Sequence, residues 1–283
     1  MRRLRILLAT FSLLALTAVL LDFTGVSARW FGWLAKLQFL PAALACSVVV
    51  LVLLTAVTLL AGRVYCSVVC PLGILQDFIR WITFGRRRDN KRRCSVPGAP
   101  RAAEVDAGSW PSVLRWLRVA ILALFVGGGF LGLHFVWLDP YAIYARAAAC
   151  LAPLVRMGNN ELAAWAESHA SYCAQTVEVA VPATGFILLA AGMVALIAAL
   201  AAWRGRVWCN TVCPVGTLLG ALAKFAWFRP RIDASACVGC KLCERTCRTH
   251  CINVDAKAFD RTKCVSCFDC SATCPKGAIK WTK

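Results

Sequence analysis

The feature that most constrains this sequence is a dense block of regularly spaced cysteines near its C-terminus. Two runs share the spacing C-x2-C-x2-C-x3-C: Cys237, Cys240, Cys243 and Cys247, then Cys264, Cys267, Cys270 and Cys274. Short spacings of this kind let one tight loop direct three thiols at the corners of a compact metal centre. Structural zinc sites also use C-x2-C pairs, but eight cysteines in this order favour iron–sulfur chemistry.

This double run has the arrangement of bacterial two-cluster ferredoxins, in which the fourth cysteine of each run binds the other cluster. The spacing therefore predicts two [4Fe–4S] clusters, one held by Cys237, Cys240, Cys243 and Cys274, the other by Cys264, Cys267, Cys270 and Cys247. One assignment stays open. Arg248 replaces the usual proline after Cys247, and Cys251 follows four residues later, so Cys251 is an alternative ligand to Cys247.

Composition indicates a membrane protein for the rest of the chain. Of the 283 residues 60% are hydrophobic and 16% charged, against about 25% charged in soluble domains. A soluble enzyme and a disordered protein are both excluded by this balance. The net charge is +18, but the aromatic residues lie within apolar runs, so we expect no nucleic-acid partner and assign the positive charge to membrane loops.

Four apolar stretches approach the ~20 residues that cross a bilayer. They are Ile6–Leu21, Phe39–Ala61, Trp116–Val136 and Val179–Trp203. The first is the shortest, and its basic start and the Val26-Ser27-Ala28 triplet also fit a cleaved signal peptide.

Loop charges predict the orientation. Residues 85–118 hold nine Lys and Arg and three acids, whereas residues 134–178, expected to be an outer loop, hold two Arg and four acids. Under the positive-inside rule the first loop is cytoplasmic and the second external. We therefore expect a multi-pass protein of the bacterial inner membrane with both termini in the cytoplasm, in contact with membrane lipid.

The membrane part contains an internal repeat. Gly62-Arg63-Val64-Tyr65-Cys66 and Cys70-Pro71-Leu72-Gly73 recur 143 residues later as Gly205-Arg206-Val207-Trp208-Cys209 and Cys213-Pro214-Val215-Gly216. The predicted fold is an α-helical integral membrane protein of four transmembrane helices in two pseudo-repeated hairpins (residues 1–230), followed by a small α+β ferredoxin-like domain (residues 231–283).

The repeat places four further cysteines at the cytoplasmic membrane edge. Cys66 and Cys70, and likewise Cys209 and Cys213, lie four residues apart and would share a helix face. Four thiolates could hold a third Fe–S cluster, and soft thiolates also suit copper. A reducible dithiol is the remaining alternative.

Taken together, the duplicated C-x-x-x-C-P motifs and the cysteine-rich tail resemble the NapH/MauN family of ferredoxin-type membrane proteins. The resemblance implies a quinol dehydrogenase component that passes electrons between the quinone pool and a partner redox protein or reductase. Related proteins with C-x-x-x-C-P motifs act as accessory or maturation factors of metalloenzymes, and this is the alternative function.

A quinol site requires hydrogen-bonding groups at the ends of the spans. Polar residues in such positions include His134 and Asp139, which follow the third apolar stretch. We take these two as the candidate catalytic residues, with quinone or quinol as the diffusible redox partner.

Overall fold

The computed structural model describes residues 1–88, 112–130, 138–169 and 176–282. The chain begins with α1 (Arg2–Leu21), α2 (Val26–Lys36), α3 (Phe39–Leu44), α4 (Val48–Ala61), α5 (Tyr65–Val68), α6 (Pro71–Arg88) and α7 (Ser112–Phe130). It continues with α8 (Pro140–Ser168), α9 (Thr184–Arg204), α10 (Val207–Thr211) and α11 (Pro214–Ala223). The tail contains β1 (Arg229–Ile232), α12 (Leu242–Thr246), β2 (Ile252–Asn253), β3 (Ala258–Phe259), α13 (Asp269–Thr273) and β4 (Ile279–Thr282).

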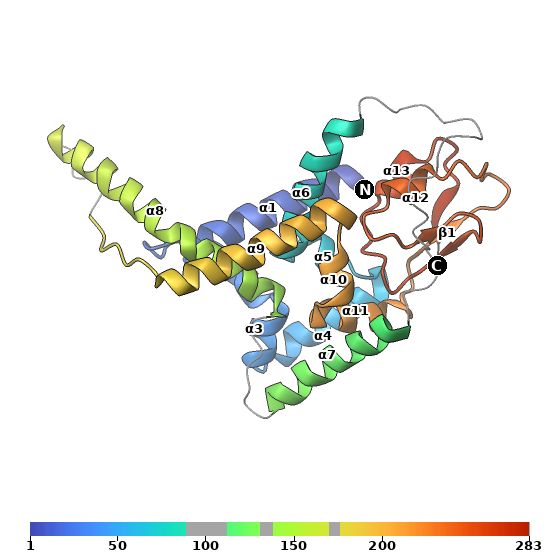
Figure 1. Cartoon of the computed structure of the whole chain (residues 1–283), viewed down its shortest axis with the longest axis horizontal. Coiled ribbons are helices and arrows are strands. Elements are labelled where there is room, and N and C mark those ends of the chain that lie inside the picture. Colours follow the sequence, from blue (N-terminus) through green and yellow to red (C-terminus); the bar gives the residue numbers. More distant parts are fainter. Residues whose placement is uncertain (89–111, 131–137, 170–175, 283) are drawn as a thin grey trace.

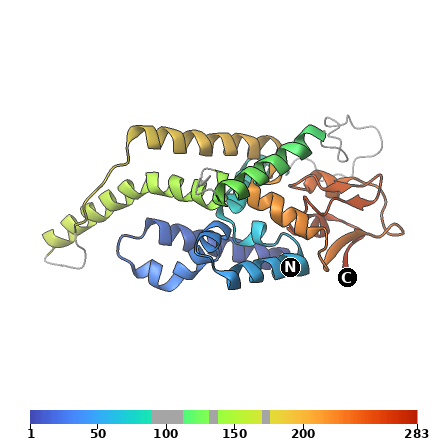
Figure 2. The ribbon, with the colours of Figure 1, turned by 90° about the horizontal axis from the view of Figure 1, so that it is seen from below.

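The long helices lie roughly side by side, and the tail packs at one end of them (Figures 1 and 2). Helix α8 packs against both α1 and α9, and α6 packs against α8 and α9. The main core contains Leu54, Leu72, Ile143, Ile197 and Leu219. The two halves of the repeat therefore share one core.

Two of the described helices are long and apolar enough to cross a membrane, α1 with 20 residues and α9 with 21. The expectation of four transmembrane helices is not supported. The predicted span 39–61 is divided into α3 and α4 because Cys46 has a left-handed backbone (φ 49°) and ends the first segment. Helix α4 alone has 14 residues, which rise about 21 Å, less than the ~30 Å of a hydrocarbon core.

The predicted third span is also shorter in the structure. Within α7 the apolar segment covers Trp116–Phe125, and the expected continuation through residues 131–136 lies outside the described residues.

Residues 140–168, within the segment expected to be an outer loop, form a long helix, and the side of the membrane on which this segment lies stays a prediction. Asp139 caps α8 by accepting a hydrogen bond from the Ala142 amide (2.9 Å), and Pro140 occupies the first turn, where its missing N–H carries no penalty. The alanine-rich sequence favours a helix, although scattered Arg and Glu residues keep its hydropathy below that of a span.

The tail is a compact unit of short antiparallel strands and helices. Strand β1 pairs with β4 through Ile232 and Ile279, and β2 pairs with β3. Helices α12 and α13 pack together. The buried tail core contains Ile252, Val254 and Ile279 together with several of the cysteines, so the thiols themselves form much of its interior.

Backbone hydrogen bonds attach the tail to the end of α4. The amides of Trp227 and Phe228 donate to the carbonyls of Leu59 and Leu60, each at 2.8 Å. The Ser266 hydroxyl donates to the Ala61 carbonyl at 2.9 Å. The loop that carries the second cysteine run therefore sits directly against the helical part.

Candidate metal centres

The tail contains a pocket lined by the four cysteines expected to hold the first cluster. Cys237, Cys240, Cys243 and Cys274 all line it. Apolar side chains complete the wall, among them Ile232. Residues of the two separate cysteine runs therefore meet at one point, as the crossed ligand pattern of a two-cluster ferredoxin requires.

The second set of thiols surrounds Cys247. Burial raises the pKa of Cys267 to about 12, and the charges of Asp269 and Cys247 act in the same direction. Burial likewise raises the pKa of Cys270, and the charges of Cys267, Cys247 and Cys264 add to this effect. Cys247 is thus close enough to all three of its predicted companions to interact with their charges.

Cys251 lies beside the second set of thiols, next to Cys247. Its sulfur is 3.5 Å from that of Cys247, and its amide donates to the Cys247 sulfur at 3.4 Å. A hydrogen bond from the Cys251 thiol is the largest cause that lowers the pKa of Cys247, to about 6. A hydrogen bond with Cys251 also lowers the pKa of Cys264. Cys251 therefore lies between two thiols, and its single S–H can donate to one of them at a time.

Each half of the repeat begins with a glycine that ends a long helix. Gly62 follows α4 with φ 75°, ψ −157°, and Gly205 follows α9 with φ 77°, ψ −129°. This part of backbone space is essentially restricted to glycine. A Cβ on Gly205 would also lie 2.5 Å from the Arg248 carbonyl oxygen. The chain can therefore turn sharply into each C-x-x-x-C-P segment and lie close to the tail.

The last cysteine of each motif caps the helix that follows it. The Cys213 sulfur accepts a hydrogen bond from the Gly216 amide at 3.3 Å, and the Gly73 amide makes the same contact with Cys70. A Cβ on Gly73 would lie 2.4 Å from the Cys66 carbonyl oxygen, and one on Gly216 would lie 2.2 Å from that of Cys209. Glycine is required at both positions because two backbone segments touch there.

The arginine of each motif reaches across to the other half. Arg206 donates to the Cys66 carbonyl at 2.6 Å, and Arg63 donates to the Cys209 carbonyl at 3.2 Å. Both arginines are 1% exposed. The sequence alone does not predict this role, although the two arginines stand at the same place in both motifs, and this duplication is the signal that points to them.

The four motif cysteines are all buried, with exposed fractions of 3 to 4%. They are Cys66, Cys70, Cys209 and Cys213. Burial raises the pKa of Cys209 to about 11, whereas the charge of Arg206 acts in the opposite direction. Burial also raises the pKa of Cys213, and the charges of Cys209, Cys70 and Cys66 raise it further. The four thiols therefore lie close enough to interact electrostatically.

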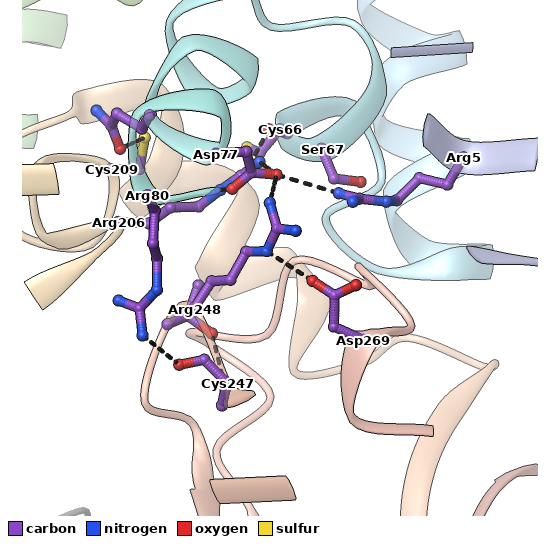
Figure 3. Close-up of polar contacts among 12 residues, drawn as sticks. Arg5, Cys66, Ser67, Asp77, Arg80, Arg206, Cys209, Cys247, Arg248 and Asp269 are labelled. Atoms are coloured by element: carbon purple, nitrogen blue, oxygen red, sulfur yellow. Dashed lines mark hydrogen bonds and ion pairs between the residues drawn. The ribbon is translucent and has the colours of Figure 1, made fainter. Parts of the chain in front are cut away.

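Asp77 is the shared ion-pair partner of three arginines from different parts of the chain (Figure 3). It lies on α6 and pairs with Arg206 at 2.7 Å, with Arg248 of the tail at 2.8 Å and with Arg5 of α1 at 3.1 Å. Burial raises the pKa of Asp77, but Arg206 and Arg248 outweigh it, and the pKa lies well below its usual range. Arg248 in turn pairs with Asp269 of α13 at 2.6 Å.

The predicted quinol-site residues are placed only in part. His134 lies outside the described residues. Asp139 is 1% exposed and caps α8, and its charge raises the pKa of Tyr65, though less than the burial of Tyr65 does. The Tyr65 hydroxyl donates to Gln38 at 2.8 Å. Asp139 thus lies in a buried polar cluster next to the first motif.

The donor sets suit clusters better than single ions. Among the described residues, no three His, Cys, Asp or Glu side chains converge on a point that would hold one metal ion. A [4Fe–4S] cluster makes a different demand, because its four thiolates bind separate iron atoms. The eight tail cysteines therefore fit two clusters by donor type and grouping, and the four motif thiols fit a further thiolate-bound centre.

Comparison with known proteins supports iron–sulfur binding. A family described as a 4Fe-4S binding domain matches the chain twice, over residues 43–92 and 184–234. Each matched segment contains one C-x-x-x-C-P motif, and both end before Cys237. The chain is thus similar to ferredoxin-type iron–sulfur proteins over the two halves of its repeat.

Two curated proteins resemble it in sequence. One is the "Putative electron transport protein YccM" of Escherichia coli, 25% identical over 215 residues, which are 74% of this chain and 47% of that protein. The other is "Uncharacterized protein MJ0749" of Methanocaldococcus jannaschii, 39% identical over 74 residues, 26% of this chain and 29% of that protein. The chain thus spans less than half the length of either relative. No solved structure matches it significantly.

Proposed function

We propose that this chain is a membrane-anchored iron–sulfur protein that transfers electrons between the quinone pool and a partner redox protein. The observation that carries the proposal is the meeting of Cys237, Cys240, Cys243 and Cys274 in one pocket of the tail. The electron transport relative and the 4Fe-4S family description agree with it. When bound, two [4Fe–4S] clusters supply two one-electron acceptors, which matches the two electrons that a quinol releases with two protons.

The ligands of the second cluster are Cys264, Cys267, Cys270 and Cys247 in this proposal. Cys247 is preferred to Cys251 because its charge affects both Cys267 and Cys270. The pKa of Cys251 is instead raised chiefly by its hydrogen bonds with Cys247 and Cys264. Cys251 then serves as a hydrogen-bond donor to ligand sulfur, a contact that tunes cluster potential.

The packing of the tail suggests an order for the redox sites. Val265 belongs to the main helical core, and Cys267 packs against that core. The pocket of the first set is lined only by residues between Ile232 and Ile279. In this proposal the second cluster lies between the motif thiols and the first cluster, and the first cluster exchanges electrons with the partner protein.

Membrane anchoring is part of the proposal, with α1 and α9 among the spans and membrane lipid around them. The segment from α2 to α4 returns the chain to the side of the tail, because Asp77 of α6 pairs with Arg5 and Arg248. An ion pair of 2.9 Å between Arg2 and Asp269 puts the N-terminus beside the tail, and this supports the same side, the cytoplasm of a bacterial cell, for both. The cluster of Asp139, Tyr65 and Gln38 is the candidate quinol-binding region, where these groups would hydrogen-bond quinol hydroxyls.

The test is reduction by quinol of anaerobically purified chain without partner proteins. Menaquinol or ubiquinol should produce cluster EPR signals within seconds, and iron analysis should give about 8 iron atoms per chain, or about 12 with a third cluster. Iron-containing protein that no quinol reduces would contradict the quinol step and favour a maturation factor, for which the four buried motif thiols provide a redox-active site.

A further inference from the structure

The two motif arginines differ in how their charges are compensated. Arg206 has both oxygens of Asp77 as partners, at 2.7 and 2.8 Å. Arg63 donates instead to three uncharged oxygens: Asn210 Oδ1 at 2.8 Å, the Thr262 carbonyl at 2.9 Å and the Cys209 carbonyl at 3.2 Å. Within the described part of the chain its Nε has no hydrogen-bond partner.

The repeat explains why this difference exists. The residue 143 positions after Asp77 is Gly220, so the second half offers no carboxylate at the corresponding place. A Cβ on Gly220 would lie 2.7 Å from the Thr262 carbonyl oxygen, which occupies the space that a side chain would need. Among the described residues no carboxylate lies within ion-pair distance of Arg63, and a guanidinium stays charged in proteins.

A buried cation without an anion is costly, so an anion belonging to the functional state is expected nearby.

Two kinds of thiol that would become anionic on metal binding lie on the segments that Arg63 contacts: those of the second set, through the Thr262 carbonyl, and the motif thiol Cys209, through its own carbonyl. Arg63 binds the carbonyl of Thr262, two residues before Cys264, and the next residue of that loop, Val265, is 1% exposed in the helical core. A cluster with four thiolates is negatively charged, and reduction adds one more negative charge.

We propose that Arg63 is a positioning residue that raises the reduction potential of the cluster bound through Cys264. The inference rests on the proposed function. A fixed positive charge at a buried site stabilises the reduced form more than the oxidised form. Arg63 would thereby make the second cluster the favoured acceptor next to the motif thiols, while the first cluster is unaffected.

Two substitutions remove the uncompensated charge in different ways. Arg63→Gln deletes the charge, and Asn210→Asp adds a carboxylate of nearly the same shape at the 2.8 Å contact and so neutralises Arg63 in place. The matched control is Arg63→Lys, which keeps the charge. The first cluster serves as an internal control in every variant.

The experiment is an EPR-monitored redox titration of iron-loaded protein. Arg63→Gln and Asn210→Asp should each shift the equilibrium of one cluster at least tenfold toward the oxidised form, equivalent to about 59 mV for a one-electron couple, and Arg63→Lys should not. Unchanged potentials in iron-loaded Asn210→Asp and Arg63→Gln would overturn the role of Arg63. If purified wild-type protein contained neither iron nor acid-labile sulfide, that result would instead overturn the proposed function.

Discussion

Arg206 donates to both carboxylate oxygens of Asp77, at 2.7 and 2.8 Å, across 129 residues of sequence. The same guanidinium holds the Cys66 carbonyl, and the same carboxylate holds Arg248 of the tail. One buried carboxylate therefore fixes the motif of the first half, the motif of the second half and the cysteine-rich tail in a single arrangement.

Asp77→Asn should weaken the attachment of the tail. The substitution leaves Arg206, Arg248 and Arg5 without their shared anion, and breaking a buried ion pair in this way costs about 3–5 kcal/mol. Hydrogen–deuterium exchange should rise in residues 246–250 and 269–273. The matched control is Asp255→Asn, because its ion pair with Lys241 is exposed; equal exchange in both variants would contradict a role for Asp77 in docking.

Substitution of Cys247 and substitution of Cys251 should have different effects on the iron content. Cys247→Ala should lose about 4 of the tail's 8 iron atoms, because one cluster loses a ligand. Cys251→Ala should keep its iron and shift the potential of one cluster to lower values, because a hydrogen bond to ligand sulfur is lost. Iron and sulfide analysis with EPR checks both, and the opposite result would make Cys251 the ligand.

The motif thiols offer a third test of metal content. If they hold a cluster, the double variant Cys66→Ala/Cys213→Ala should contain about 4 fewer iron atoms per chain than the wild type. Cys46→Ala is the control, since this cysteine is exposed and lies apart from the motif. Equal iron content in all three proteins would leave the motif thiols as a dithiol pair or a site for another metal.

The sequence addresses the candidate site most directly through local spacing, although the ligand roles of the cysteines stay a prediction. The spacing of Cys237, Cys240 and Cys243 selects a tight loop by itself, and the structure gathers them with Cys274 in one pocket. The duplicated motif was also visible as a repeat. The roles of its glycines and arginines are visible only in the structure, because the arginines contact the other half of the repeat, 143 residues away in sequence, and the glycines allow close backbone contacts.

Two expectations differ from the structure: one apolar stretch was expected to be a continuous helix, and one charged stretch was expected to be a loop rather than a helix. Residues 39–61 are apolar throughout, but the left-handed Cys46 divides them. Residues 140–168 carry enough charge to look like a loop, yet they form α8, which begins at the Asp139 cap and packs against α1 and α9. Hydropathy does not register caps or single backbone reversals, so neither feature could be found from it.

Asp139 should make stability depend on pH. Burial raises its pKa from 3.8 to about 6, so between these values the folded state retains a proton that the unfolded chain has lost. The free energy of unfolding should therefore fall as pH rises through this window, by about 3 kcal/mol in total at 1.36 kcal/mol per pKa unit.

Asp139→Asn should remove this dependence, because a neutral amide requires no proton and its oxygen can still cap α8. The variant should unfold like the wild type near pH 4 and become increasingly more stable above it, with the difference levelling off above pH 6. Asp139→Ala should lose the cap as well, at a cost of about 1 kcal/mol. Tryptophan fluorescence during denaturant unfolding in detergent measures all three proteins. Parallel pH profiles for wild type and Asp139→Asn would show that the carboxyl is already ionised at pH 4, contrary to the effect expected from its burial.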